Sequence, residues 1–125
     1  MNAMTNSVNL STQGIKSVNE GLKQVNQGAN NLKNNRVVSA GKNATNATAA
    51  FNNSKNSFKK AANTLTPYIN AKTANLNKAR RALNDASKAA ALAQGALAIS
   101  KAVQAANFLG KEANASFPNL TSVRA

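Results

Sequence analysis

Few residues in this chain are suited to catalysis or to metal binding. It contains no His and no Cys, and its three acidic residues are Glu20, Asp85 and Glu112. General acid–base catalysis needs a group that titrates near neutral pH, and most metal sites need imidazole, thiolate or clustered carboxylate ligands. The three carboxylates lie too far apart in sequence to pair on one helix. We therefore expect no enzymatic activity, no metal and no cofactor.

Short strings that resemble fragments of catalytic motifs have no supporting context. The spacing S-x-x-K, which serine acyl-transferases use, occurs at Ser39–Lys42 and at Ser57–Lys60. Gly41 and Lys42 are not preceded by the glycine that a phosphate-binding P-loop requires. We interpret these strings as chance matches.

Basic charge is the strongest global feature. Sixteen Lys and Arg against three Asp and Glu give a net charge of +13, which repels other copies and attracts polyanions. Nucleic acid bound by such helices would be held without base reading and in a salt-dependent way. The alternative is a solvated basic face. The candidate polyanion contacts are Lys55, Lys59, Lys60, Lys72, Lys78, Arg80, Arg81 and Lys88.

The first element that positions these residues is a predicted helix over about residues 5–35. Its apolar residues follow the a/d spacing of a coiled-coil-like seam. The seam contains Ile15, Val18, Leu22, Val25 and Leu32, and it begins near Val8. Gly14, Gly21 and Gly28 also recur every seven residues, and each costs about 1 kcal/mol in a helix relative to Ala. This spacing favours close backbone contact with a partner helix, the alternative being a weak, partly frayed helix.

A hinge over about residues 34–48 and a second helix over about residues 44–65 are expected to follow. The apolar phase changes here, which indicates a break rather than a stutter in one continuous helix. In the second helix Phe51 and Phe58 lie two turns apart on one face, and we interpret both as core residues rather than base-stacking groups. Pro67 then interrupts the helix. A helical hairpin at this point is favoured over a kink.

A long helix is predicted over about residues 67–113. Its seam combines alanines with a few larger residues, namely Ile69, Leu76, Leu83 and Leu97, joined by Ile99 and Val103 from a second stripe. Small side chains bury little area each. We therefore expect residues 69–97 to be sheltered by other molecules. Residues 114–125 are predicted to form an extended tail.

The sequence argues against a membrane span and against export. The longest run of low polarity, residues 89–99, is shorter than the roughly 18 residues that a spanning helix needs. The N-terminus has no basic segment followed by an apolar run, so we do not expect a secreted protein. A membrane-associated helical protein remains a second alternative.

Together these features predict a single-domain, elongated all-α protein, a two- or three-helix hairpin of coiled-coil type with an extended C-terminal tail. The predicted role is a non-enzymatic structural or assembly protein, with other copies of itself or larger assembly proteins as partners. By analogy of composition, this suits a minor virion component of a large DNA virus, in its capsid, cement or core. A basic nucleic-acid-condensing protein is the alternative. The expected location is the virion, or otherwise the cytoplasm.

Overall fold

The computed structural model describes the backbone of residues 2–116 and the side chains of residues 3–113. This part of the chain is all-α, as predicted, but it holds four α-helices rather than two or three. They are α1 (Asn2–Lys33), α2 (Val37–Leu65), α3 (Ala74–Ala91) and α4 (Gly95–Ser116), with a short 3-10 helix at Thr66–Tyr68. Residues 114–116 of the predicted tail belong to α4, and residues 117–125 lie outside the described residues.

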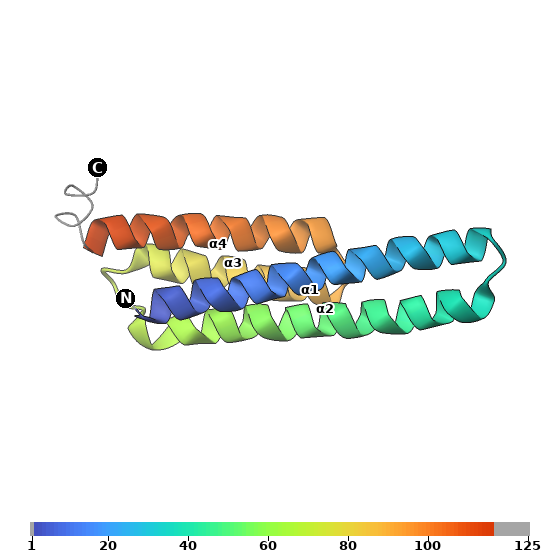
Figure 1. Ribbon diagram of the computed structural model, residues 1–125. Coiled ribbons are helices and arrows are strands. Elements are labelled where there is room, and N and C mark those ends of the chain that lie inside the picture. Colours follow the sequence, from blue (N-terminus) through green and yellow to red (C-terminus); the bar gives the residue numbers. More distant parts are fainter. Residues whose placement is uncertain (1, 117–125) are drawn as a thin grey trace.

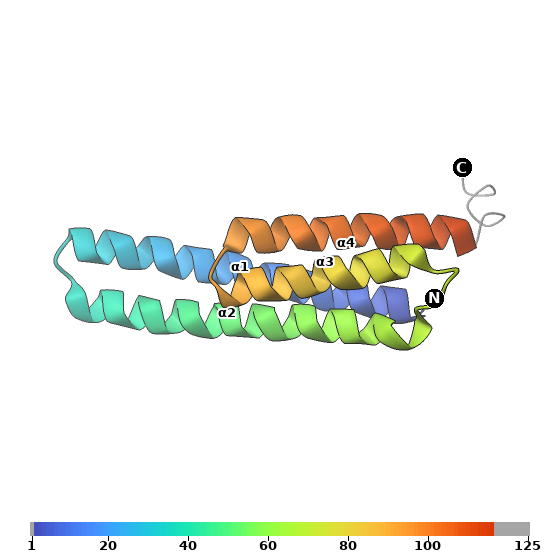
Figure 2. The same ribbon diagram turned by 180° about the vertical axis from the view of Figure 1, so that it is seen from behind.

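The helices form an uneven antiparallel bundle. α1 and α2 have 32 and 29 residues, whereas α3 and α4 have 18 and 22. The α1–α2 hairpin therefore continues well beyond the α3–α4 turn, as both views show (Figure 1, Figure 2). At 1.5 Å per residue, α1 is about 20 Å longer than α3. α2 packs against α1 and α3, while α4 packs mainly against α3 and more loosely against α1.

The predicted close contact at the glycines of the first helix is confirmed, and the partner is α2 of the same chain. A Cβ atom on Gly14 would lie 2.6 Å from Cε1 of Phe58, and one on Gly21 would lie 2.8 Å from Cζ of Phe51. Each ring thus packs directly onto helix backbone. The prediction that Phe51 and Phe58 are core residues is also confirmed, since they are 6 % and 0 % exposed.

Small residues continue this contact along the length of both helices. Every seventh residue is small and buried, namely Ser7, Gly14, Gly21 and Gly28 in α1 and Ala40, Ala47, Ser54 and Ala61 in α2. The buried hydroxyls bond across the interface: Ser7 Oγ donates to the Ala61 carbonyl at 3.0 Å and Ser54 Oγ to the Gly14 carbonyl at 2.8 Å. Each bond thus satisfies a hydroxyl that is buried in the interface.

The turn between α1 and α2 is much shorter than the predicted hinge over residues 34–48. Only Asn34, Asn35 and Arg36 separate the helices, because Asn35 adopts a left-handed φ of 59°. The amide of Arg36 then donates to the Asn31 carbonyl at 2.7 Å, in a Schellman motif that closes the helix end. The predicted break is confirmed, whereas the boundaries 5–35 and 44–65 are corrected to those of α1 and α2.

The prediction of one helix over residues 67–113 is wrong. The chain reverses at residues 92–94, where Ala93 has a φ of 58°. A second Schellman motif forms there, with the Gln94 amide donating to the Ala89 carbonyl at 2.8 Å. The hairpin favoured at Pro67 is confirmed: α2 ends at Leu65, and α3 returns alongside it.

The core lies where all four helices overlap, and it corrects the expectation that residues 69–97 need other molecules as shelter. Leu76 and Leu83 are 1 % and 0 % exposed, and five alanines of α3 are at most 6 % exposed, namely Ala79, Ala82, Ala86, Ala89 and Ala90. Their cover comes from the chain itself, because α3 packs between α2 and α4. Leu92 and Leu97, at 70 % and 46 % exposed, are exceptions near the α3–α4 turn.

Candidate interaction surfaces

The carboxylates do not converge in the described part of the chain. Glu20, Asp85 and Glu112 belong to α1, α3 and α4 respectively, and no group of three or more His, Cys, Asp and Glu residues that is suited to a metal ion occurs among the described residues. The carboxylate of Glu20 accepts a hydrogen bond from Nε2 of Gln24 at 2.9 Å. The surfaces of interest are therefore defined by apolar and basic side chains.

The first surface, which we name the distal edge, is the apolar side of the α1–α2 hairpin beyond Leu22. Val18 is fully buried, but Val25 and Leu32, which continue its row, are 48 % and 59 % exposed. At the tip of the hairpin Val37 and Val38 are 69 % and 76 % exposed. α3 and α4 end before this region (Figure 1). The predicted seam thus extends past the helices that cover it.

Amide side chains hold α1 and α2 together along the distal edge. Nδ2 of Asn31 donates to Oδ1 of Asn43 at 2.7 Å, and Nδ2 of Asn43 donates to Oε1 of Gln24 at 2.9 Å. These hydrogen bonds join α1 and α2 in this part of the hairpin, whereas aromatic rings of α2 pack on α1 in the part that α3 and α4 cover. The hairpin is therefore held at its tip without burying the apolar side chains of the distal edge.

The second surface is the α1/α4 groove. Two cavities of about 110 and 470 Å³ lie in series between these helices. Val8 and Val103 line them and are 39 % and 49 % exposed. The remaining lining is mostly small or apolar, including Ala102, Ala106 and Gly110. The loose contact between α1 and α4 therefore leaves an apolar groove between them.

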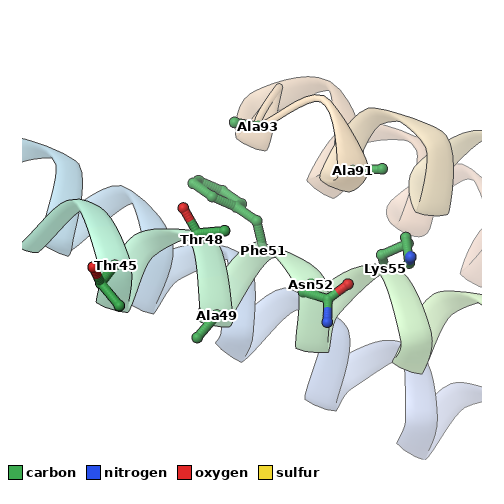
Figure 3. A pocket seen from close by; sticks show the side chains of 8 residues that line it. All are labelled: Thr45, Thr48, Ala49, Phe51, Asn52, Lys55, Ala91 and Ala93. Carbon is green, nitrogen blue, oxygen red and sulfur yellow. The ribbon is translucent and has the colours of Figure 1, made fainter.

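The third surface, the α2/α3 groove, is basic at one end and less polar at the other. Lys55, Lys59 and Lys88 line its basic end, with a volume of about 340 Å³. The other end, of about 630 Å³, lies beside the α3–α4 turn and is shown in Figure 3, where the Phe51 side chain rises from α2 toward Ala93. Lys55 and Ala91 line both ends, so the groove is continuous. At its junction Ser87 Oγ donates to the Lys55 carbonyl at 2.9 Å.

The structure divides the eight candidate polyanion contacts among several places. Nζ of Lys78 lies 5.8 Å from the centre of the Phe108 ring, on the side of α3 that faces α4. A guanidinium nitrogen of Arg80 donates to Oδ1 of Asn77 at 2.9 Å, which ties this side chain to its own helix. The other exposed candidates are Lys60, Lys72 and Arg81. Only Lys55, Lys59 and Lys88 meet in one groove.

The predicted packing seam is likewise divided. The buried members are Val18, Phe51, Phe58, Leu76 and Leu83; the half-buried ones are Ile15, Leu22, Ile69 and Ile99; the exposed ones are Val25, Leu32, Leu97 and Val103. The exposed members all lie on the distal edge, in the α1/α4 groove or near the start of α4. They are the seam residues that the bundle itself does not cover.

Sequence reasoning missed several residues that shape these surfaces. The amide of Asn43 and the hydroxyl of Ser87 form hydrogen bonds between neighbouring helices. Thr48, Ala49 and Asn52 line the α2/α3 groove. The four-residue spacing of Lys55 and Lys59 places them on one face of α2. Nothing local in the sequence indicates that Lys88 joins them, because that depends on the register of α3 against α2.

Comparison with known proteins finds no matching family model, no similar curated protein and no similar solved structure. A search of the described helices for a membrane-crossing segment finds none with the required length and apolar character.

Proposed function

We propose that this protein is a non-enzymatic helical assembly component that packs against further copies of itself through the distal edge. The observation that carries the proposal is the exposure of Val25 and Leu32, at 48 % and 59 %, in direct continuation of the buried seam. Exposed apolar side chains in one row of a helical hairpin are typical of a surface that another helix covers. The uneven bundle leaves room for a neighbouring hairpin in this position (Figure 1).

Electrostatics determine how such an assembly responds to salt. A chain of net charge +13 repels its copies at low ionic strength. Raising the salt concentration to about 1 M shortens the screening length to about 3 Å and removes most of this repulsion, while hydrophobic association persists. Self-association is therefore expected to increase with salt.

The test is the mass of the purified protein in solution, measured by analytical ultracentrifugation across a salt series. We expect a rise in mass with salt for the unaltered chain and a monomer at every salt concentration for the double variant Val25→Asn with Leu32→Asn. Tyr68→Asn is the matched control, because Tyr68 is 48 % exposed but lies at the other end of α2. A well-folded monomer at all salt concentrations refutes the proposal.

Nucleic-acid condensation is the second candidate function, and the net charge of +13 favours it. Its salt dependence has the opposite sign, because phosphate binding releases counterions and weakens steeply as salt rises. Retention on duplex DNA over the same salt series therefore separates the two functions. Assignment to a virion stays a prediction from composition, and localisation by immunogold labelling tests it.

A further inference from the structure

We infer that the α2/α3 groove is a docking site for an acidic amphipathic helix of a partner protein. The inference deepens the proposed assembly function by naming a second, oppositely charged partner, and it depends on a surface separate from the distal edge. It rests on three observations: the continuity of the groove, the difference between its two ends, and the charge of the residues that line it.

The dimensions of the groove suit a helix. On α2 it runs from Thr45 to Lys59, which is about 21 Å at 1.5 Å per residue. This length accommodates about four turns of a second helix. Thr48, Asn52 and Lys55 lie at spacings of three and four between the two ends, so they form one face of α2.

The residues that line the groove favour a partner helix that is apolar at one end and acidic at the other. At one end three alanines, Ala49, Ala91 and Ala93, line the groove together with Phe51, whose side chain points toward Ala93 (Figure 3). Small walls allow a second helix to approach closely, and apolar side chains fill the space that remains. A partner helix with an apolar face at this end therefore fits.

The other end of the groove favours a negatively charged partner. Lys55, Lys59 and Lys88 line it, and none of the residues that line the groove is acidic. The nearby polar groups Asn84 and Ser87 add hydrogen-bonding capacity. Carboxylates on the partner would pair with ammonium groups that have no acidic side chain beside them in the groove. A second copy of this chain, with 16 basic and three acidic residues, supplies few such carboxylates.

Shape favours a protein helix over nucleic acid in this groove. Three lysines line a concave surface, whereas duplex DNA is convex and is met by elements that protrude into its grooves or lie along its phosphates. Single-stranded nucleic acid needs exposed aromatic faces for base stacking. Phe51 is the one aromatic residue that lines the groove, and it is only 6 % exposed.

The probe for the test is a synthetic, fluorescently labelled amphipathic peptide of about 20 residues, long enough to form a helix alone. It carries an apolar face and a cluster of Glu at one end, and a second peptide has Gln in place of every Glu. Anisotropy titrations use the full chain at low salt and at a concentration where it is monomeric. We expect the Glu peptide to bind at least tenfold more tightly than the Gln peptide.

Two matched pairs of variants localise the binding. Lys59→Glu with Lys88→Glu should raise the Kd of the Glu peptide at least tenfold, whereas Lys16→Glu with Lys23→Glu, exposed on α1, should raise it by no more than about threefold. Both double variants change the net charge equally. Asn52→Glu should weaken binding, while Asn53→Glu, an exposed neighbour outside the groove lining, should not.

Several results would overturn the inference. Equal losses in the two lysine double variants would show that net charge alone drives binding. Equal affinity for the Glu and Gln peptides, or no binding of the Glu peptide at low salt, would exclude an acidic helix as the ligand of the groove. Duplex DNA retained in place of the peptide, and lost selectively in the Lys59 and Lys88 variant, would assign the groove to nucleic acid. None of these variants alters Val25 or Leu32, so failure here is distinguishable from failure of self-association.

Discussion

Replacing Gly14 by Ala tests the closest helix contact in the bundle. The added Cβ would lie 2.6, 2.8 and 2.9 Å from three atoms of the Phe58 ring. Phe58 is fully buried, so its ring has no solvent-filled space into which to move. The two helices must therefore separate or the ring must leave its rotamer. Gly41 provides the matched control, because a Cβ there would meet nothing within 4 Å.

The size of the effect follows from two opposing contributions. Ala is favoured over Gly inside a helix by about 1 kcal/mol, and this gain applies at both positions. Overpacking of a close contact costs about 1–3 kcal/mol, and it applies at Gly14 alone. We therefore expect Gly41→Ala to stabilise the protein by about 1 kcal/mol and Gly14→Ala to range from neutral to about 2 kcal/mol destabilising. The two variants should differ by about 1–3 kcal/mol.

The assay is urea unfolding followed by far-ultraviolet circular dichroism, at one low protein concentration so that association does not contribute. Gly21→Ala should resemble Gly14→Ala, since its Cβ would lie 2.8 Å from Phe51. Gly28→Ala should fall between these and Gly41→Ala, because its nearest neighbour, Cβ of Asn43, is 3.2 Å away. If all four variants stabilise the protein equally, the close packing of α1 on α2 is refuted.

Three further predictions concern stability and use the same unfolding assay. Ala93→Gly should stabilise the protein by about 1 kcal/mol, because Ala93 has a φ of 58° and Gly carries no penalty there; a loss of stability would contradict the described turn. Phe58→Ala should destabilise it by about 3–5 kcal/mol, since the ring is 0 % exposed, and a cost below about 1 kcal/mol would exclude its core position. Ser54→Ala should cost only about 0.5–1.5 kcal/mol, because it removes one hydrogen bond, to the Gly14 carbonyl at 2.8 Å; an unchanged midpoint would show that this bond contributes nothing.

The features predictable from sequence were those that repeat within one helix. Gly14 and Gly21 recur every seven residues, and so do Phe51 and Phe58. A seven-residue period keeps residues on one face of a helix, so both close contact and burial followed from spacing alone. The period does not identify the partner. That the rings of α2 cover the glycines of α1 depends on the antiparallel register, which the three-residue turn sets.

The turn between α3 and α4 was missed because its signal is absent from the sequence. A Schellman motif usually places Gly or Asn at the left-handed position, as Asn35 does after α1. After α3 that position holds Ala93, a residue that favours helix and gives no local reason to end one. The nearest glycine, Gly95, lies two residues later. A Cβ on Gly95 would lie 2.9 Å from Leu22, so tertiary packing explains this glycine better than the turn does.

The missed turn also changes what the surfaces mean. An uninterrupted helix over residues 67–113 would have presented its alanines to other molecules, whereas reversal at Ala93 folds them into the core of the same chain. Helix α3 ends and α4 begins at this reversal, so neither helix covers the part of the α1–α2 hairpin that extends beyond it. On the α1 side, Leu22 lies beside Gly95, the first residue of α4. On the α2 side, Phe51 lies below Ala93 (Figure 3).

The α3–α4 turn therefore sets the positions of two candidate surfaces. Beyond it, α1 exposes the apolar row of the distal edge; beside it, α2 lines the less polar end of the α2/α3 groove. Helices α3 and α4 are shorter than α1 and α2, so the bundle leaves Val25 and Leu32 of the distal edge uncovered. The two proposed interactions therefore differ in salt dependence: the proposed self-association through the distal edge increases as charge is screened, whereas the proposed binding of an acidic partner in the α2/α3 groove is strongest at low salt.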